Sequence, residues 1–434
     1  MAGSEKGSGR QASSEGQTMK DDKNLLMVII SGHDRPGITA TFSRILYEHG
    51  IEVMGIEQAS LQNLLGLYLL LDMSGAKNPT DSVIKDLLFE ATQLKLTLNF
   101  RFFSPREVKM MNQKSLYVLT YFGGTRALAE LSQILGEEGV NIEVISSLAH
   151  QSLRSVEMIL NMSGSVSLTR LKQRIMVKSR EIGIDLALQK MEAYRKNKRI
   201  VFFDMDSTLV DMEIIDEMAR RAGVYREVAR ITEKAVRGDL DFEEALRQRV
   251  AMLKGLNVGA LADIRDQMKV SPGVDELLAT LKHLGFKLCV ITGGFDFFSD
   301  YLKEKYGFDF AFANRLEIKN GALTGRIAGR IVDGAEKARV VNQVSLEQGI
   351  LLDQTVVVGD GANDALMLGQ AGLGIAYNAN TKLDQAAHGS LGKSRLMNIL
   401  HFLGITEEDI AEAVGNPPLA LLDSGKGESA KGGM

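Results

Sequence analysis

Four groups of residues in the second half of the chain could together bind a metal ion and transfer a phosphoryl group. They combine carboxylates with one lysine, a few hydroxyl groups and adjacent glycines. In chain order the groups are Asp204, Asp206 and Thr208; Thr292, Gly293 and Gly294; Lys337; and Asp360, Asn363 and Asp364. Carboxylate oxygens are the hard ligands that Mg²⁺ takes, and N–H groups and cations stabilise a phosphoryl group in transfer. The pattern therefore predicts an enzyme.

Two aspartates are the candidate catalytic residues. A carboxylate can attack phosphorus and form an aspartyl-phosphate, which divides a difficult hydrolysis into two easier steps. Asp204 ends an apolar run and is the candidate nucleophile. Asp206 is the candidate general acid, which protonates the leaving oxygen, and then the general base, which deprotonates the attacking water.

The other groups are expected to bind the cofactor and the phosphate. Mg²⁺ is the predicted cofactor, with Asp204, the backbone carbonyl of Asp206 and Asp360 as protein ligands. The ion would offset the repulsion between the phosphate and the attacking carboxylate. Thr208 and Asp364 are expected to support these ligands from behind. The phosphate oxygens are expected to contact Thr292, Gly293, Gly294, Lys337 and Asn363.

Each group alone has a plainer explanation. Asp206 could be a turn or cap residue, residues 292–294 could be a tight loop, and Lys337 could be a solvated charge on a helix. Their fixed order and the position of the acids after apolar runs favour phosphoryl transfer. Histidines are scattered without the spacing of metal ligands, so none is given a role.

A parallel sheet would bring these groups together. Strands are expected at 199–203, 287–291, 310–313, 355–358 and 372–376, with helices at 213–222, 274–284, 296–306, 335–348 and 364–370. This alternation predicts an α/β fold, a doubly wound Rossmann-like parallel sheet whose carboxyl edge binds ligands. The helical stretch at about 212–270 is expected to form a cap. Residues 315–333 are expected to form a β-hairpin flap with turns at Asn320-Gly321 and Gly325.

The N-terminal half contains an internal repeat. Both copies show the order βαββαβ of the ferredoxin-like plan. Helices are expected at 38–48 and 82–93 in the first copy and at 127–137 and 168–182 in the second.

Composition excludes several classes of protein. The 434 residues, 45 % of them apolar, suffice for about two to four domains. A net charge of −4 argues against a nucleic-acid surface, and no apolar run reaches the roughly 18 residues of a membrane span. The start of the chain lacks the apolar core of a signal peptide, and the single cysteine, Cys289, leaves no internal disulfide. We expect a cytoplasmic protein with a disordered tail at 1–22 and a flexible tail at 413–434.

The two repeats, at 23–105 and 112–192, resemble the ACT domain, a regulatory module that often binds amino acids. Residues 33–38 resemble the strand-to-helix loop of that family, which implies an amino-acid effector at Asp34 and Gly37. The second copy has Gly123 and Gly124 in the equivalent place but lacks the aspartate and the proline, so ligand binding there stays open. The resemblance also implies a homodimer.

Residues 196–412 resemble the haloacid dehalogenase superfamily and, within it, the phosphoserine phosphatases. That resemblance implies that Glu213 contacts the amino group of the substrate, that Arg249 binds its carboxylate and that Phe242 covers the site. It implies Mg²⁺-dependent hydrolysis of O-phospho-L-serine to L-serine and phosphate, the last step of serine synthesis. Thr292 is a departure, because serine is common there in the family.

Other functions stay open at this point. The chain could pass the phosphoryl group from phosphoserine to another alcohol, or it could be a small-molecule phosphatase of different specificity. An amino-acid sensor without activity would be expected to have lost a nucleophile or a metal residue, and the sequence keeps both. The predicted cap argues against phosphoprotein substrates.

Overall fold

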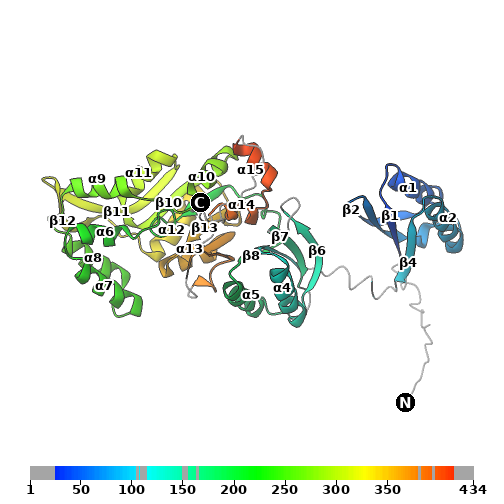
Figure 1. The fold of residues 1–434 in the computed structure, drawn as a ribbon, viewed down its shortest axis with the longest axis horizontal. Coiled ribbons are helices and arrows are strands. Elements are labelled where there is room, and N and C mark those ends of the chain that lie inside the picture. The colour runs from blue at the N-terminus through cyan, green and yellow to red at the C-terminus, as the bar shows by residue number, and fades with distance from the viewer. Residues whose placement is uncertain are drawn as a thin grey trace, which may run out of the picture. The chain divides into compact units, whose positions relative to one another are not determined.

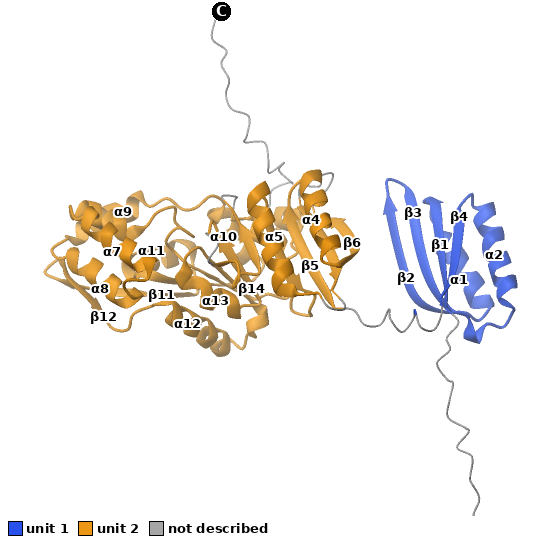
Figure 2. Cartoon of the chain, turned by 90° about the horizontal axis from the view of Figure 1, so that it is seen from below, with its two compact units in different colours: residues 1–114 blue, residues 115–434 orange. Residues whose placement is uncertain are grey.

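The computed structural model describes residues 25–103, 107, 115–148, 155–162, 166–379, 383–392 and 396–414. The expected tail at 1–22 lies outside this set, as does most of the tail expected at 413–434; positions 413 and 414 instead end helix α15 (Glu407–Val414). The chain divides into two compact units, residues 1–114 and 115–434 (Figure 2). No helix among the described residues has the length and apolar character needed to cross a membrane.

Unit 1 is a four-stranded antiparallel sheet with two helices. Its elements are β1 (Leu25–His33), α1 (Ile38–Glu48), β2 (Glu52–Leu61), β3 (Leu64–Asp72), a 3₁₀ turn at Met73–Gly75, α2 (Thr80–Gln93) and β4 (Thr97–Phe103). The strand order is β2-β3-β1-β4. Helix α1 buries Ile38, Phe42 and Leu46, one residue per turn, so a single apolar stripe fixes this helix on the sheet.

The second unit begins with the same order of elements. These are β5 (Leu116–Phe122), α4 (Thr125–Glu137), β6 (Asn141–Ser147), β7 (Ser155–Asn161), α5 (Leu168–Ile182) and β8 (Asp185–Lys190), with strand order β8-β5-β7-β6. Strand β8 also pairs antiparallel with the short strand β15 (Gly389–Leu391). The βαββαβ segment and the α/β part of this unit therefore share one eleven-stranded sheet.

The α/β part contains six parallel strands in the order β11-β10-β9-β13-β14-β15. Besides β15 they are β9 (Ile200–Phe203), β10 (Lys287–Phe295), β11 (Phe310–Lys319), β13 (Thr355–Gly359) and β14 (Leu373–Tyr377). In β9, Val201 and Phe203 enter one apolar core while Ile200 and Phe202 enter another. Since neighbouring strand residues point to opposite faces, the sheet is buried on both sides.

Helices cover the sheet on both sides (Figure 1). They are α10 (Val274–His283), α11 (Asp296–Tyr306), α12 (Gly334–Glu347), α13 (Ala365–Gln370), α14 (Asn398–Phe402) and α15. A second group lies between β9 and β10 in the chain, at the cap expected near 212–270: α6 (Ile214–Arg221), α7 (Tyr225–Arg237), α8 (Phe242–Met252) and α9 (Val258–Gln267).

The expected hairpin flap is formed by β11 and β12 (Ala322–Ala328), which pair antiparallel. Its turn is at Asn320 and Gly321, both with positive φ, as a two-residue turn between twisted strands requires. The prediction of a second turn at Gly325 is wrong. Gly325 lies inside β12 with φ +79°, where a Cβ would come within 3.1 Å of the Ala251 carbonyl oxygen on α8. A glycine at this place lets the hairpin approach the cap helix instead of turning the chain.

Candidate active site

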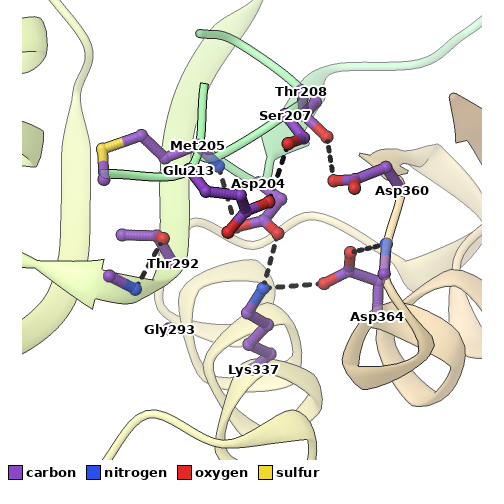
Figure 3. Close-up of polar contacts among 12 residues, drawn as sticks. Asp204, Met205, Ser207, Thr208, Glu213, Thr292, Gly293, Lys337, Asp360 and Asp364 are labelled. Carbon is purple, nitrogen blue, oxygen red and sulfur yellow. Dashed lines mark hydrogen bonds and ion pairs between the residues drawn. The ribbon is translucent and has the colours of Figure 1, made fainter. Parts of the chain in front are cut away.

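Two neighbouring strands deliver the acidic residues of the site. Asp204 follows β9 and Asp360 follows β13, and the backbone N–H of Asp204 donates to the Val358 carbonyl at 2.9 Å. The carboxylates of Asp204, Asp360 and Asp364 each place an oxygen within 4.8 Å of the others (Figure 3). This group of three is where the described residues could hold a divalent cation.

Lys337 ties two of these carboxylates together (Figure 3). Its side chain is fully buried, and its Nζ lies 2.9 Å from Oδ2 of Asp204 and 2.7 Å from Oδ1 of Asp364. The other oxygens are also engaged: Oδ1 of Asp204 accepts from the Met205 amide at 2.8 Å, and Oδ2 of Asp364 accepts from the Gly361 amide at 3.0 Å. Asp204 is therefore held in one orientation by a cation and a backbone amide.

Asp360 is oriented by the first loop. Oγ1 of Thr208, itself buried, donates to Oδ1 of Asp360 at 2.9 Å. Thr208 thus connects the residues after β9 with those after β13.

The site carries more negative charge than one lysine balances. Burial, followed by the charges of Asp204 and Asp364, raises the pKa of Asp360 to about 8. Burial and then Asp204 raise the pKa of Asp364 to about 7, although Lys337 opposes this. Burial alone would lower the pKa of Lys337, but the two aspartates outweigh it and raise that pKa. A divalent cation would supply the missing positive charge, so this donor set fits one.

Asp206 has a different environment from the three clustered acids. Burial, then Glu213 and Asp204, raise its pKa well above the usual value. Its Oδ1 is buried and has no hydrogen-bond partner among the described residues. Its carboxylate is not among the clustered ones, so it is free to act on a bound substrate. A raised pKa favours the protonated form of this carboxyl group, which can serve as an acid.

The loop that ends β10 is closely packed against the site. Oγ1 of Thr292 accepts from the Gly294 amide at 2.8 Å. A Cβ at Gly293 would lie 2.9 Å from Cζ of Phe242, and one at Gly294 would lie 3.0 Å from Oδ2 of Asp206. Both positions need glycine because neighbouring side chains occupy that space.

Sequence reasoning missed one residue that holds this loop. The fully buried Asn314, on β11, donates from Nδ2 to the Gly293 carbonyl at 2.8 Å, and its Oδ1 accepts from the Val332 amide at 2.9 Å. The only signal in the sequence is a lone amide side chain soon after an apolar run, which is too common to identify such a role.

A cavity of about 130 Å³ opens over these residues. The expected site residues in its lining are Asp204, Asp206, Glu213, Phe242, Arg249, Thr292, Gly293, Gly294, Asp360 and Asn363. The other three residues expected at this site, Thr208, Lys337 and Asp364, are buried and do not line the cavity. Each of them contacts a residue that does.

Two residues of opposite charge from the cap segment enter this cavity. Glu213 precedes α6, and its Oε1 accepts from the Ser207 hydroxyl at 2.7 Å. Burial raises the pKa of Glu213, and burial lowers the pKa of Arg249 on α8 although Glu213 opposes that shift. A ligand with one ammonium and one carboxylate would complement the pair.

The expected effector residues of unit 1 border a separate hollow. Asp34 and Gly37 line a groove of about 510 Å³ together with Arg35, Gln58 and Asn63. The Asp34 amide donates to the Asn63 carbonyl at 2.7 Å, and Gly37 has φ +98° directly before α1.

The chain is similar to known families and proteins. The haloacid dehalogenase-like hydrolase family matches residues 201–369, and the ACT domain family matches residues 24–101. The chain is 42 % identical over 307 residues to a phosphoserine phosphatase of Archaeoglobus fulgidus, which covers 70 % of this chain and 89 % of the relative. It is 36 % identical over 397 residues to a phosphoserine phosphatase of Streptomyces coelicolor, covering 90 % and 95 %.

Solved structures give the same picture of the fold. A probable phosphoserine phosphatase of Vibrio cholerae, in its unliganded form, is 31 % identical with a TM-score of 0.53, and the match covers 69 % of this chain and 88 % of that one. A haloacid dehalogenase family hydrolase of Salmonella enterica serovar Typhi is 27 % identical with a TM-score of 0.57, over 66 % and 98 % of the two chains.

Proposed function

This chain belongs to the phosphoserine phosphatase family of haloacid dehalogenase-like hydrolases, and from that premise we propose that it hydrolyses O-phospho-L-serine to L-serine and phosphate. The observation that carries the proposal is one cavity that joins Asp204 and Asp206 to Glu213 and Arg249. The first pair suits phosphoryl transfer and the second suits an amino acid.

Asp204 is the nucleophile in this proposal. Its carboxylate attacks phosphorus, a P–O bond forms, and the bond to the serine oxygen breaks. Asp206 gives its proton to that oxygen as serine leaves, and then takes a proton from the water that hydrolyses the aspartyl-phosphate. Lys337 and the Met205 amide fix the orientation of Asp204, so little reorganisation precedes the attack.

We propose Mg²⁺ as the cofactor, held by Asp204, Asp360 and the backbone carbonyl of Asp206, with Asp364 and Thr208 supporting them. When bound, the ion supplies positive charge that offsets the repulsion between phosphate and carboxylate. Support comes from three carboxylates gathered within 4.8 Å and from the raised pKa values of two of them.

The remaining contacts define the substrate. Thr292, the amides of Gly293 and Gly294, Lys337 and Asn363 are proposed to hold phosphate oxygens. Thr292 offers the same hydroxyl as the serine common in the family. The ammonium of phosphoserine would face Glu213, its carboxylate would face Arg249, and Phe242 would cover the site.

Regulation and assembly complete the proposal. We propose that residues 112–192 form a second ACT domain, because the order βαββαβ and the strand arrangement of unit 1 recur there. The groove at Asp34 and Gly37 is the proposed site for an amino-acid effector. The proposal also includes a homodimer that works in the cytoplasm in the last step of serine synthesis.

The decisive experiment measures phosphate release from phosphoserine, phosphothreonine and sugar phosphates, with and without Mg²⁺ and an added acceptor alcohol. We expect Mg²⁺-dependent release from phosphoserine, with serine as the second product. Transfer to the added alcohol in preference to water would instead assign a phosphotransferase. Release from sugar phosphates as fast as from phosphoserine would contradict the proposed roles of Glu213 and Arg249 in recognising the substrate.

The covalent step has its own test. Asp204→Asn keeps the shape of the side chain but removes the nucleophile, so turnover should fall by at least about a thousandfold. The melting temperature should stay within a few degrees of the parent. Retention of activity would exclude an aspartyl-phosphate at this residue.

A further inference from the structure

A second cavity lies within unit 2, where the βαββαβ segment meets the α/β part. It measures about 290 Å³ and shares no lining residue with the active site. Its lining includes Tyr117, Lys172 and Leu188, which come from β5, α5 and β8. It also includes Lys198 and His388, which come from the α/β part.

Two lysines in this cavity lack a carboxylate partner. Lys198 is buried and Lys172 is partly buried, and within the described ranges neither forms an ion pair within 4.0 Å. Each donates one hydrogen bond to a backbone carbonyl: Lys172 to that of Gln385 at 3.2 Å and Lys198 to that of Asp353. An ammonium has three donors, so both lysines retain hydrogen-bonding capacity toward a group in the cavity.

The lysines lie close enough to act on one group. Burial, followed by the charges of Lys172 and Lys198, lowers the pKa of His388 to about 4. Burial also lowers the pKa of Lys172 and brings that of Lys198 to about 8. Asp384 and Asp353 act on Lys172 and Lys198 from beyond ion-pair distance. Shielding a cation from water without a carboxylate in direct contact is costly, and a bound anion would lower that cost.

His388 adds a neutral donor to the same cavity. Its Nδ1 accepts from the Gly374 amide at 2.9 Å, so the ring proton of the neutral form is on Nε2. Arg195, which lines the cavity and is 6 % exposed, has a buried Nε with no partner among the described residues.

The acids that border the cavity do not cancel these donors. Glu192 is paired with Lys190 at 2.5 Å, and Arg195 pairs through its other end with Glu157. Asp353 lies beyond ion-pair distance of Lys198 but acts on its charge. The balance leaves a cationic cavity with an apolar side at Tyr117 and Leu188.

We infer that this junction cavity is a binding site for the oxyanion group of a small molecule, held by Lys172, Lys198 and His388. The shared chemistry is a phosphate or a carboxylate. Since Lys172 comes from α5 and the other two residues come from the α/β part, the ligand would bridge the two parts of the unit. Binding of the ligand would therefore depend on how these two parts pack together, or would stabilise that packing.

A fluorescence titration can read this site alone. The chain contains no tryptophan, so Tyr117→Trp places the only tryptophan, which can be excited selectively, in the cavity lining. We expect a saturable change of emission with inorganic phosphate or with malonate, tested separately in chloride buffer. A response to phosphate alone assigns a phosphate group, and a response to malonate alone assigns a carboxylate.

Variants in the same background decide whether the cations are responsible. Lys172→Gln with Lys198→Gln should weaken binding at least about tenfold. Lys178→Gln is the matched control, because Lys178 is also on α5 but pairs with Glu130 and Glu181 on the surface. Asp204→Asn should leave the titration unchanged, since it alters only the catalytic cavity.

Absence of a saturable response, or an equal response in the double lysine variant, overturns the proposal. A thermal measurement covers the case in which the tryptophan variant does not fold. With the natural sequence, malonate or phosphate should raise the melting temperature. For the anion that does so, the rise should persist in Lys178→Gln and should be smaller in the double variant. An unchanged rise in the double variant also overturns the inference.

Discussion

At the scale of single residues, the active site is defined by crowded carboxylates. Asp204 has a cation and a backbone amide as partners, whereas the pKa values of Asp206 and Asp360 are raised, first by burial and then by neighbouring acids. The same type of side chain therefore occupies two kinds of environment in one site. The difference follows from their neighbours, because every one of them is an aspartate.

Crowding predicts that metal binding releases protons. Without metal, Asp360 with a pKa of about 8 and Asp364 with a pKa of about 7 hold protons at pH 7 that a cation would displace. We expect about one proton released per Mg²⁺ at pH 7 and almost none at pH 9, where both groups are already ionised. Calorimetric titration in buffers of different ionisation enthalpy measures this number. Equal release at the two pH values would contradict the expected crowding.

Arg249 should act on the carboxylate end of the substrate. Arg249→Ala removes a charged contact worth about 2–3 kcal/mol, so KM for phosphoserine should rise roughly 30- to 150-fold. Arg247→Ala on the same helix is the control, because Arg247 pairs with Glu243 at the surface. KM for O-phosphoethanolamine, which lacks the carboxylate, should not change in either variant. A parallel rise for both substrates would mean that Arg249 only stabilises the cap.

At the scale of elements, the hairpin of β11 and β12 supports the site from two sides. Asn314 on β11 holds the Gly293 carbonyl, and Gly325 on β12 lies against α8, the helix that carries Arg249. The hairpin therefore connects the loop at residues 292–294 to helix α8.

A pair of glycine substitutions isolates the contact between hairpin and cap. Gly325 and Gly329 both have φ +79°, but a Cβ at Gly329 meets nothing within 4 Å, whereas one at Gly325 meets the backbone of α8. Gly329→Ala should cost about 1 kcal/mol of stability from backbone strain alone, and Gly325→Ala about 2–3 kcal/mol. Denaturant unfolding measures both values. Equal losses would show that the contact with α8 contributes nothing.

The sequence anticipated elements whose periodicity is long and regular. Helices at 38–48, 168–182 and 296–306 agree with α1, α5 and α11 at both ends, because each has an apolar stripe at helical spacing. The three-residue strand β15 was missed, since so short a segment has no period and its pairing with β8 spans about half of the chain. The buried role of Asn314 was also missed because it depends on a carbonyl distant in sequence.

At the scale of the whole molecule, the second unit depends on a junction within its own sheet. Strand β15 pairs with only two residues of β8, Leu186 and Ala187. His388, directly before β15, adds three links: its carbonyl accepts from Leu188, its amide donates to Gly374, and its ring accepts from the Gly374 amide. One histidine thus connects β8 with β14 across the shortest strand of the sheet.

This arrangement predicts a loss of stability in mild acid. Burial, with Lys172 and Lys198, lowers the pKa of His388 from its ordinary value of 6.5 to about 4. Between those values the unfolded chain binds more protons than the folded chain, so the contribution is present above pH 6.5 and is lost as the pH falls towards 4. The loss is at most about 3 kcal/mol. His388→Asn keeps an acceptor for the Gly374 amide but does not titrate, so the free energy of unfolding of the parent should fall more than that of the variant from pH 7 to pH 5. If the free energy of unfolding changed equally with pH in the parent and the variant, measured in chloride buffer, protonation of the His388 ring would not be coupled to the packing of this sheet.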